Sequence, residues 1–576
     1  MEYKAAYEEW LGSTYFDEAT KKELEAIKDN DAEIRERFYA DLEFGTGGLR
    51  GIIGAGTNRM NIYTVRKATQ GLANYIVRME KQKQGVAIAF DSRRMSPEFA
   101  EEAALCLAAN GIPVYIFESL RPTPELSFAV RELSAVAGIN VTASHNPPEY
   151  NGYKVYWEDG AQITPPHDVE ILKEVKAVTD FATVKTMTKE DAIAAGLYHV
   201  IGRDIDDKYI ACLKKLVLHQ DCIKQTAKDM KIVYTPLHGT GNLPVRRVLA
   251  ELGFEQVFVV PEQELPNGNF PTVSYPNPEA AEAFALGLEL AKKIDADLVL
   301  ATDPDADRLG VYVKDAKTGE YRTLTGNMSG CLLADYEIGQ KKELFGLPAD
   351  GALISTIVST NMAKAIAEYY GVRFYEVLTG FKFIGQKMLE FETSGDGTYL
   401  FGFEESYGCL IGDHARDKDA VVATMALCEA AAYYKTKGMT LWDAMLALYE
   451  RYGYYKDDIL SVTMKGIEGL QKIQGSMTSL RENPPKEVGG YRVLAIRDYK
   501  ENIVKNLETG ETKETGLPSS NVLYFEMEND TWLCVRPSGT EPKIKLYFGV
   551  KGISMEDAEQ KSKALAVSVK EMFDRL

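Results

Sequence analysis

The sequence is poor in cysteine, has no long apolar run and carries no excess of positive charge. Its seven cysteines are scattered, odd in number and never spaced as Cys-x-x-Cys. This argues against a secreted fold held by disulfides and predicts free thiols in a reducing cytoplasm. No apolar run reaches the ~18 residues that a membrane span needs, and the first residues lack the basic and then apolar profile of a secretory signal. We therefore expect a cytoplasmic protein with no membrane partner.

The charge balance limits the ligands that the protein can bind. Lys and Arg number 66 against 85 Asp and Glu, which gives a net charge of -19. Binding to a nucleic-acid backbone requires a basic face, so this balance argues against a nucleic-acid partner. A ligand that carries phosphate would need a site where basic residues gather locally within an acidic whole.

The length and the hydrophobic pattern predict several domains. A chain of 576 residues is too long for one hydrophobic core, since single cores stop growing near ~250–300 residues. Short apolar runs alternate with helix-like segments in three successive copies, at 86–90, 113–117 and 135–141, at 232–234, 256–260 and 298–301, and at 352–357, 372–377 and 399–401. The alternation predicts three tandem α/β domains with mixed or parallel sheets. Such sheets bind ligands at the carboxyl ends of their strands.

The two ends of the chain depart from this pattern. The first 40 residues have helical spacing. Near the other end, a closing helix is expected at 555–575, after strand-like runs at 493–496, 521–526, 531–535 and 543–549. This order predicts a C-terminal α+β domain, with the segment 477–490 as a linker or hinge because it contains Pro484-Pro485. The domains expected are 1–205, 206–320, 321–455 and 456–576.

A serine lies in the polar loop after the expected strand 135–141. The loop reads Thr-Ala-Ser-His-Asn-Pro-Pro over 142–148, with Ser144 at its centre. A serine at a strand end among turn-forming residues presents an exposed hydroxyl, although a purely structural turn has the same composition. The loop is not a G-x-S-x-G elbow, which argues against serine-hydrolase chemistry.

Three carboxylates alternate in the loop after the expected strand 298–301. Asp303, Asp305 and Asp307 can converge on one point, where they would repel one another without a cation. Oxygen ligands in this number favour a hard divalent metal, and Mg²⁺ with open positions for a phosphate oxygen fits best. The loop lacks the glycine and the glutamate of an EF-hand. A solvated acidic turn is the alternative interpretation.

Two further loops carry groups suited to a phosphorylated sugar. The segment 402–408 holds Glu404 and Ser406, whose oxygens can accept and donate several hydrogen bonds to sugar hydroxyls. The segment 536–542 supplies a guanidinium fork, two hydroxyls and an unhindered backbone N–H, which together suit a phosphate, in Arg536, Ser538, Gly539 and Thr540. Each segment is also compatible with a plain glycine turn.

Two other glycine-containing loops include a cation. One is Thr379-Gly380-Phe381-Lys382, in which we expect Thr379, Gly380 and Lys382 to bind substrate, and the other is the segment 44–51, which contains Arg50. His238 follows a predicted strand too, but no neighbouring residue suits it as a catalytic partner, so we expect it to be structural.

Four of these motifs together resemble the α-D-phosphohexomutase family, which includes phosphoglucomutases and phosphomannomutases. The motifs T-A-S-H-N-P-P-x-Y-N-G-x-K, D-P-D-A-D-R, G-F-E-E-S-Y-G and R-P-S-G-T-E-P occur in the family's order. The forms G-F-E-E-S and T-G-F-K look most like the longer branch with phosphoglucomutases and phosphopentomutases. The resemblance covers most of the chain and implies four domains around a central cleft.

The resemblance also implies a role for each motif residue. Ser144 would be the phosphoserine, and its phosphate would share one Mg²⁺ with Asp303, Asp305 and Asp307. Sugar hydroxyls would contact Glu404 and Ser406, and the phosphate that does not react would be bound by Arg536, Ser538, Gly539 and Thr540. The cations of the cleft would be Arg50, Lys154, Arg308 and Lys382, with Lys154 and Arg308 nearest the transfer. Some relatives carry a histidine where this chain has Gly408, so an acid or base role of that histidine does not transfer.

The implied reaction interconverts glucose 1-phosphate and glucose 6-phosphate, with glucose 1,6-bisphosphate as intermediate and activator. The residues leave other substrates open, namely mannose, pentose or hexosamine phosphates, as well as synthesis of glucose 1,6-bisphosphate from a separate donor. A phosphatase with the same serine and metal, and a sugar-phosphate sensor without catalysis, are alternatives of other classes. A monomer or a homodimer is expected.

Overall fold

The computed structural model describes residues 2–575 apart from 46, 465 and 539–542, and it divides the chain into two compact units. Unit 1 comprises residues 1–325, 381–396 and 407–440, and unit 2 comprises 326–380, 397–406 and 441–576. Gly539 and Thr540 of the predicted phosphate loop lie outside the described residues. None of the helices described is long and apolar enough to span a membrane.

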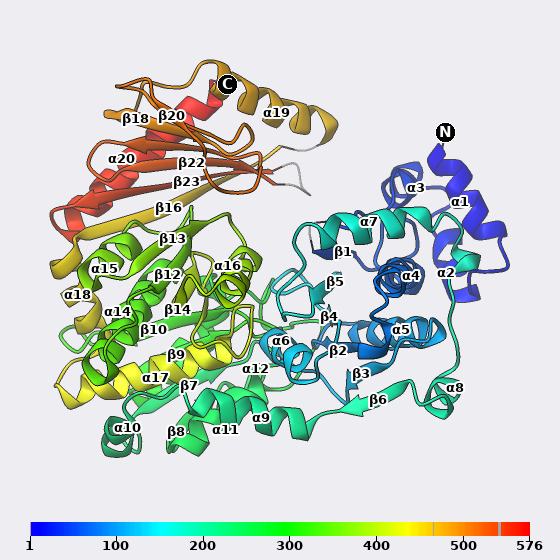
Figure 1. Ribbon diagram of the computed structural model, residues 1–576, viewed down its shortest axis with the longest axis horizontal. Coiled ribbons are helices and arrows are strands. Elements are labelled where there is room, and N and C mark those ends of the chain that lie inside the picture. Colours follow the sequence, from blue (N-terminus) through cyan, green and yellow to red (C-terminus); the bar gives the residue numbers. More distant parts are fainter. Residues whose placement is uncertain (1, 46, 465, 539–542, 576) are drawn as a thin grey trace. The chain divides into compact units, whose positions relative to one another are not determined.

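The first sheet of unit 1 has six strands in the order β1-β5-β4-β2-β3-β6 (Figure 1). Its strands are β1 (Gly48–Ile52), β2 (Val86–Phe90), β3 (Val114–Phe117), β4 (Ala137–Val141), β5 (Tyr150–Trp157) and β6 (Tyr198–Ile201). The neighbours of β2 and β3 are parallel, whereas β5 returns antiparallel to β4 and places Lys154 opposite Asn140. Every residue of β2 and β4 is buried, as expected for central strands covered on both faces. The helices of this part are α4 (Ile62–Arg78), α5 (Ser96–Ala109), α6 (Thr123–Glu132), α7 (His167–Ala177) and α8 (Lys189–Ala194).

The helical N-terminus consists of three short helices, α1 (Glu2–Gly12), α2 (Glu18–Glu25) and α3 (Asp31–Phe38). The chain breaks between them because Asp17 and Asn30 accept hydrogen bonds from the N–H groups of Thr20 and Glu33 and so begin new helices. Aromatic side chains fill the space between the helices, with Trp10 stacked on Phe16 at 4.0 Å between ring centroids.

The second sheet of unit 1 has five strands in the order β11-β10-β9-β7-β8. The parallel strands are β7 (Lys231–Thr235), β8 (Gln256–Val259) and β9 (Leu298–Thr302), followed by the antiparallel β10 (Leu309–Lys314) and β11 (Tyr321–Leu324). The three aspartates occupy the short connection from β9 to β10. The remaining elements of unit 1 are α9 (Arg203–Lys214), α10 (Gln220–Thr226), α11 (Asn242–Leu252), α12 (Pro261–Glu264), α13 (Ala285–Ile294), α16 (Phe381–Ser394), β15 (Gly408–Leu410), α17 (Ala420–Thr436) and 3₁₀ turns at Gln82–Gln84, Phe181–Thr183 and Ala281–Phe284.

Unit 2 begins with a parallel sheet in the order β13-β12-β14. The strands are β12 (Gly351–Thr356), β13 (Arg373–Val377) and β14 (Thr398–Glu404), and the helices are α14 (Gly326–Phe345), α15 (Met362–Tyr370) and α18 (Leu441–Tyr452). The third α/β pattern of the sequence is therefore confirmed. The Glu404 loop follows directly from the carboxyl end of β14.

The C-terminal part of unit 2 is an antiparallel sheet with two helices, in which α20 lies across the strands (Figure 1). Side chains of both helices enter one hydrophobic core with the sheet, which confirms the predicted α+β arrangement. Its elements are β16 (Tyr454–Thr463), α19 (Gly466–Glu482), β17 (Glu487–Val488), β18 (Tyr491–Asp498), β19 (Ile503–Asn506), β20 (Thr512–Lys513), β21 (Leu523–Met527), β22 (Trp532–Pro537), β23 (Lys543–Gly552) and α20 (Met555–Asp574).

The prediction of a linker over 477–490 is wrong for its first part. Residues 477–482 form the last turns of α19, and Met477 and Leu480 are buried in the core of the C-terminal domain. Their spacing of three residues places both side chains on one face of the helix. Prolines 484 and 485 end this helix instead of marking a boundary between domains.

Candidate functional site

Ser144 lies in the loop that begins where β4 ends, and it is buried. Its Oγ donates a hydrogen bond to Oδ2 of Asp303 at 2.8 Å, although the two residues come from loops of different sheets. Its backbone has a φ of 52°, in the left-handed region that costs L-residues conformational energy. Nδ1 of His145 lies 3.1 Å from the same Oγ. Asp303 and His145 therefore both contact the Ser144 hydroxyl, which the sequence analysis had identified.

The three aspartates are buried at the carboxyl end of β9 and converge, as the sequence predicted. One oxygen of Asp303 accepts the backbone N–H groups of Asp307 and Arg308 at 3.1 and 3.0 Å. One oxygen of Asp305 accepts Oγ1 of Thr123 at 2.8 Å and Nζ of Lys154 at 2.9 Å. The second oxygen of Asp305 is buried and accepts no hydrogen bond from any described residue. An unsatisfied buried carboxylate oxygen calls for a hydrogen-bond donor or a cation.

The electrostatics of this loop fit a divalent cation. Burial, followed by the charges of Asp305 and Asp307, raises the pKa of Asp303 well above its usual value. Burial acts in the same direction on Asp305, but the Lys154 ammonium and several hydrogen bonds outweigh it and lower the pKa of that carboxyl. Three buried carboxylates of this kind cannot all stay charged unless more positive charge is added. Oxygen ligands that converge from one tight loop suit Mg²⁺.

The predicted cations are divided between the immediate surroundings of the aspartates and positions farther away. Lys154 contacts Asp305, and its Nζ lies 3.7 Å from Asp307. Arg308 pairs with Glu279 at 2.6 Å and reaches Asp307 only at 3.8 Å. Arg50 extends along the serine loop and donates to the side chain of Asn146 at 3.3 Å.

Lys382 is half-buried in unit 1, and burial lowers the pKa of its ammonium, with the charge of Asp168 opposing this effect. Of the four predicted cations, Lys154 donates a side-chain hydrogen bond to Asp305, and Arg308 donates its backbone N–H to Asp303.

Sequence reasoning missed Lys418, which contacts the same aspartates. Its Nζ lies 3.1 Å from Oδ2 of Asp307 and 3.0 Å from Oδ1 of Asp417. Asp417 also accepts the hydroxyl of the buried Tyr156 at 2.8 Å. The signal was present as a run of four charged residues, 416–419, directly before the apolar helix α17. Such a run at the start of a buried helix needs internal partners.

The sugar loop lies in unit 2, where β14 ends. Glu404 is buried, and one of its oxygens accepts Oγ of Ser406 at 2.8 Å. The neighbouring Glu405 has a different partner, since its carboxylate accepts a hydrogen bond from Oγ1 of Thr356 at 2.9 Å. Burial, followed by the charge of Glu404, raises the pKa of Glu405 to about 7, against the opposing effect of Arg536. The motif therefore contains two different carboxylates, a distinction that its sequence does not reveal.

The other residues predicted to bind substrate in unit 2 lie in two loops. Gly380 has a φ of 118°, which only glycine adopts without strain, and Oγ1 of Thr379 beside it is buried without a hydrogen-bond partner among the described residues. Arg536 lies near the end of β22, within electrostatic range of Glu405. The N–H of Ser538 donates to the carbonyl of Lys543 at 2.7 Å and closes the loop between β22 and β23.

The raised pKa of Glu405 predicts a pH dependence of stability. The pKa of Glu405 is higher in the folded than in the unfolded protein. Its contribution to the free energy of unfolding is therefore greatest below the usual pKa of 4.5 and is lost as the pH rises through about 7. The shift corresponds to roughly 3 kcal/mol. We expect Glu405→Gln to raise the melting temperature at pH 8 and to leave it nearly unchanged at pH 5, whereas the exposed Glu501→Gln changes neither. Equal profiles for Glu405→Gln and the wild type would contradict this interpretation.

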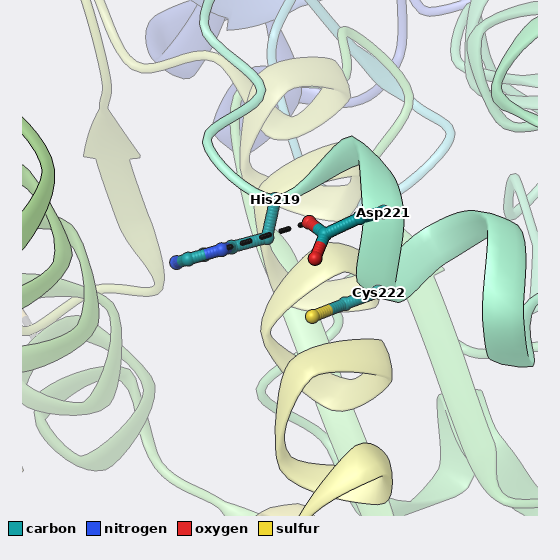
Figure 2. A group of neighbouring side chains, drawn as sticks. All are labelled: His219, Asp221 and Cys222. Atoms are coloured by element: carbon teal, nitrogen blue, oxygen red, sulfur yellow. Dashed lines mark ion pairs between the residues drawn. The ribbon is translucent and has the colours of Figure 1, made fainter.

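A second group of potential metal ligands, His219, Asp221 and Cys222, lies at the start of α10 (Figure 2). Two of its members, His219 and Cys222, lie against side chains of α17 instead. The imidazole of His219 lies against the ring of Tyr433 at 4.8 Å between centroids. Burial raises the pKa of the Cys222 thiol, and Asp221 is exposed. Because these side chains have other contacts and Asp221 is exposed, we assign no metal here.

His238 is structural, as predicted. Its two ring nitrogens lie 3.0 Å from the carbonyl of Leu265 and 3.0 Å from Oγ1 of Thr272. All seven cysteines are free, and all but Cys212 are buried.

Comparison with known proteins identifies the family. Residues 41–181, 207–319 and 325–452 match domains I, II and III of the alpha/beta/alpha type described for phosphoglucomutase/phosphomannomutase. The chain belongs to the phosphoglucomutase/phosphomannomutase family. It is therefore a phosphosugar mutase, an intramolecular phosphotransferase of the isomerase class. Each matched segment covers the central strands of one of the α/β sheets.

Relatives within this family match over almost the whole chain. The phosphoglucomutases of Staphylococcus aureus strains MSSA476 and USA300 are 38% identical over 540 residues, which is 94% of this chain and 95% of theirs. Among solved structures, a phosphomannomutase homologue from Thermus thermophilus has a TM-score of 0.67 at 22% identity, covering 93% of this chain and 99% of that one. The phosphoglucomutase parafusin from Paramecium has a TM-score of 0.67 at 17% identity, covering 93% and 95%.

Proposed function

We propose that this mutase interconverts glucose 1-phosphate and glucose 6-phosphate through phosphorylated Ser144 and a glucose 1,6-bisphosphate intermediate. The observation that supports this most is the hydrogen bond of 2.8 Å between the Ser144 hydroxyl and Asp303, within a buried cluster of three aspartates. A hydroxyl beside a divalent-cation site can carry a phosphoryl group whose charge the cation offsets. The extended match to phosphoglucomutases supports glucose as the sugar.

The proposed reaction uses Ser144 twice. The phosphoserine gives its phosphoryl group to the free hydroxyl of the sugar phosphate, which forms the bisphosphate and frees the Ser144 hydroxyl. After the sugar has reversed its orientation, Ser144 Oγ attacks the other phosphate and the phosphoserine forms again. Phosphoryl transfer of this kind depends on positioning and on charge stabilisation.

Asp303, Asp305 and Asp307, with an oxygen of the phosphoserine, would hold Mg²⁺. When bound, Mg²⁺ supplies positive charge that offsets the charge of the phosphoryl group. Lys154 and Lys418 add two ammonium groups on the Asp305 and Asp307 side of the cluster. These cations orient the carboxylates and can donate to the oxygens of the group in transfer.

The loops of unit 2 that carry Glu404 and Arg536 would recognise the sugar and the phosphate that is not transferred. Glu404 and Ser406 offer acceptors and a donor to sugar hydroxyls. The guanidinium of Arg536 and the hydroxyl of Ser538 would bind a phosphate dianion, together with Gly539 and Thr540. Recognition of a dianion rather than of one sugar face allows either phosphate of the intermediate to bind there.

A coupled assay tests the substrate. Glucose-, mannose- and ribose-1-phosphate are compared with Mg²⁺ and a trace of the corresponding bisphosphate. Glucose 1-phosphate is expected to give the highest kcat/KM. A higher value for mannose or pentose phosphate would overturn the choice of sugar and leave the mutase chemistry intact. Release of inorganic phosphate at the rate of turnover would instead show a phosphatase.

Replacing Arg536 by alanine tests the phosphate site. Because Arg536 is proposed to contact the phosphate that does not react, its loss removes binding shared by the ground state and the transition state. We expect KM to rise by about 10- to 100-fold with a much smaller change in kcat. Arg492→Ala, an exposed arginine of the same sheet, serves as control. An unchanged KM in Arg536→Ala would contradict the assignment.

A further inference from the structure

Arg93 is almost completely buried, and its guanidinium lies beneath the loop that carries Ser144. It follows β2 in the turn that leads to α5, and only 1% of its surface is exposed. Its two terminal nitrogens donate to four backbone carbonyls, those of Ser144 at 2.6 Å, Pro147 at 2.9 Å, Tyr150 at 3.1 Å, and also Asn146. One planar fork thus satisfies carbonyls from both ends of the loop 144–150. An ammonium group could not supply this set of directions.

Asp91 fixes the start of the serine loop through Thr142. Its Oδ2 lies 3.3 Å from Nε of Arg93 and accepts Oγ1 of Thr142 at 2.6 Å. The same Oγ1 of Thr142 accepts the backbone N–H of Ser144 at 2.9 Å. The N–H of Ser144 is therefore fixed through Thr142 and Asp91, and its carbonyl is fixed by Arg93. We call Asp91 and Arg93 together the backbone clamp.

The remaining face of Arg93 is closed by the second α/β domain of unit 1. The ring of Phe270 lies 5.0 Å from the guanidinium carbon, a cation–π contact. Gly268, two residues earlier, approaches the backbone of residues 92–94 so closely that a Cβ would lie 2.5 Å from the N atom of Arg94. The guanidinium therefore has little freedom to move.

The clamp matters because Ser144 has an unfavourable backbone conformation. A φ of 52° in a residue other than glycine persists only where the surroundings impose it. The side chain of Ser144 cannot impose it, because in the proposed reaction its Oγ is bonded to phosphorus in one state and free in the other. The backbone must therefore be held by groups that do not change during the cycle.

We propose that Arg93, held by Asp91, is a positioning residue that keeps Ser144 in its left-handed conformation and so aims Oγ at the phosphoryl group. This inference rests on the proposed serine relay. Neither clamp residue needs to touch the substrate. A loosened loop would slow transfer in both directions and expose the phosphoserine to water.

The test is Arg93→Lys, which keeps the positive charge and removes the planar fork. Dephosphorylated enzyme is mixed with glucose 1,6-bisphosphate, and the rate of phosphorylation of Ser144 is measured. We expect this rate to fall about 100-fold, with KM for glucose 1-phosphate changed less than about threefold and with more phosphate released to water per turnover. Arg94→Lys is the matched control, since the exposed Arg94 donates to the carbonyl of Pro148 in the same loop at 3.0 Å. Rates equal to those of the wild type in folded Arg93→Lys would overturn the proposal.

A second pair of variants covers the case in which Arg93→Lys does not fold. Thr142→Val removes the hydroxyl that links Asp91 to the N–H of Ser144, and Thr142→Ser retains it. We expect about a tenfold loss of the phosphorylation rate in the first variant and near wild-type rates in the second. Equal rates in the two would overturn the proposal. Hydrogen exchange of the backbone amides over 142–150, measured without substrate, tests the backbone clamp separately from the proposed serine relay. Faster exchange in Thr142→Val, with a wild type that lacks mutase activity, would reject the proposed function and retain the clamp.

Discussion

Replacing Ser144 by alanine is expected to abolish mutase turnover, with a loss of at least ~10³-fold in kcat. In the proposed reaction this oxygen stores the phosphoryl group between two transfers, and the variant lacks it. The fold is expected to survive, because the hydroxyl contributes one hydrogen bond to Asp303 and lies near His145, whereas the backbone of the loop is held by Arg93. Turnover is measured by a coupled assay and stability by thermal melting.

The control for this prediction is Ser119→Ala. Ser119 is an exposed serine of the same unit, and its hydroxyl accepts a hydrogen bond from Arg121 at 2.6 Å. This variant should keep its turnover. A Ser144→Ala protein that melts like the wild type and still turns over at the wild-type rate would eliminate the serine relay.

Replacing Asp303 by asparagine is expected to lower turnover by about 10³-fold and to remove the stabilisation that Mg²⁺ gives the wild type. The substitution keeps the shape of the side chain and an oxygen for the backbone N–H groups of Asp307 and Arg308. It removes a carboxyl that is costly to charge, because burial and the charges of Asp305 and Asp307 hold its pKa well above its usual value. The metal-free variant should therefore melt no lower than the metal-free wild type.

The measurement for Asp303→Asn is a set of melting curves with Mg²⁺ and with a chelator. The wild type should melt higher with Mg²⁺, since a ligand that binds only the folded state stabilises it, and the variant should not respond. Asp295→Asn is the control, because Asp295 is an exposed carboxylate of the same domain that pairs with Lys314 at 2.5 Å. An Mg²⁺ response of the same size in Asp303→Asn would contradict a metal site at the three aspartates.

Local patterns were sufficient to locate the main chemical groups along the sequence. Ser144 and the aspartates follow buried strands, and Glu404 is the last residue of β14; each was predicted at the carboxyl end of its strand. Because parallel sheets gather their functional loops at that edge, the pattern placed the residues correctly within each domain. The contact between Ser144 and Asp303 joins two domains, and no periodicity within one domain could give it. The resemblance to the phosphohexomutases supplied that pairing.

The residues that sequence reasoning missed act through contacts that are distant in the chain. Lys418 reaches Asp307 across 111 positions, and Arg93 holds carbonyls more than 50 residues away. Neither lies in a glycine-rich loop, so neither drew attention as a turn. The linker prediction at 477–490 failed for the opposite reason, because two prolines were given more weight than the apolar spacing of Met477 and Leu480.

Mass analysis of peptides from enzyme treated with glucose 1,6-bisphosphate tests the central claim most directly. We predict one phosphoryl group per chain, on the peptide that contains Ser144. When that group carries an isotopic label, unlabelled glucose 1-phosphate added to enzyme freed of bisphosphate should move the label from Ser144 to the sugar phosphate. Phosphate on any other residue, or an enzyme that turns over at its full rate and never carries phosphate, would contradict the account.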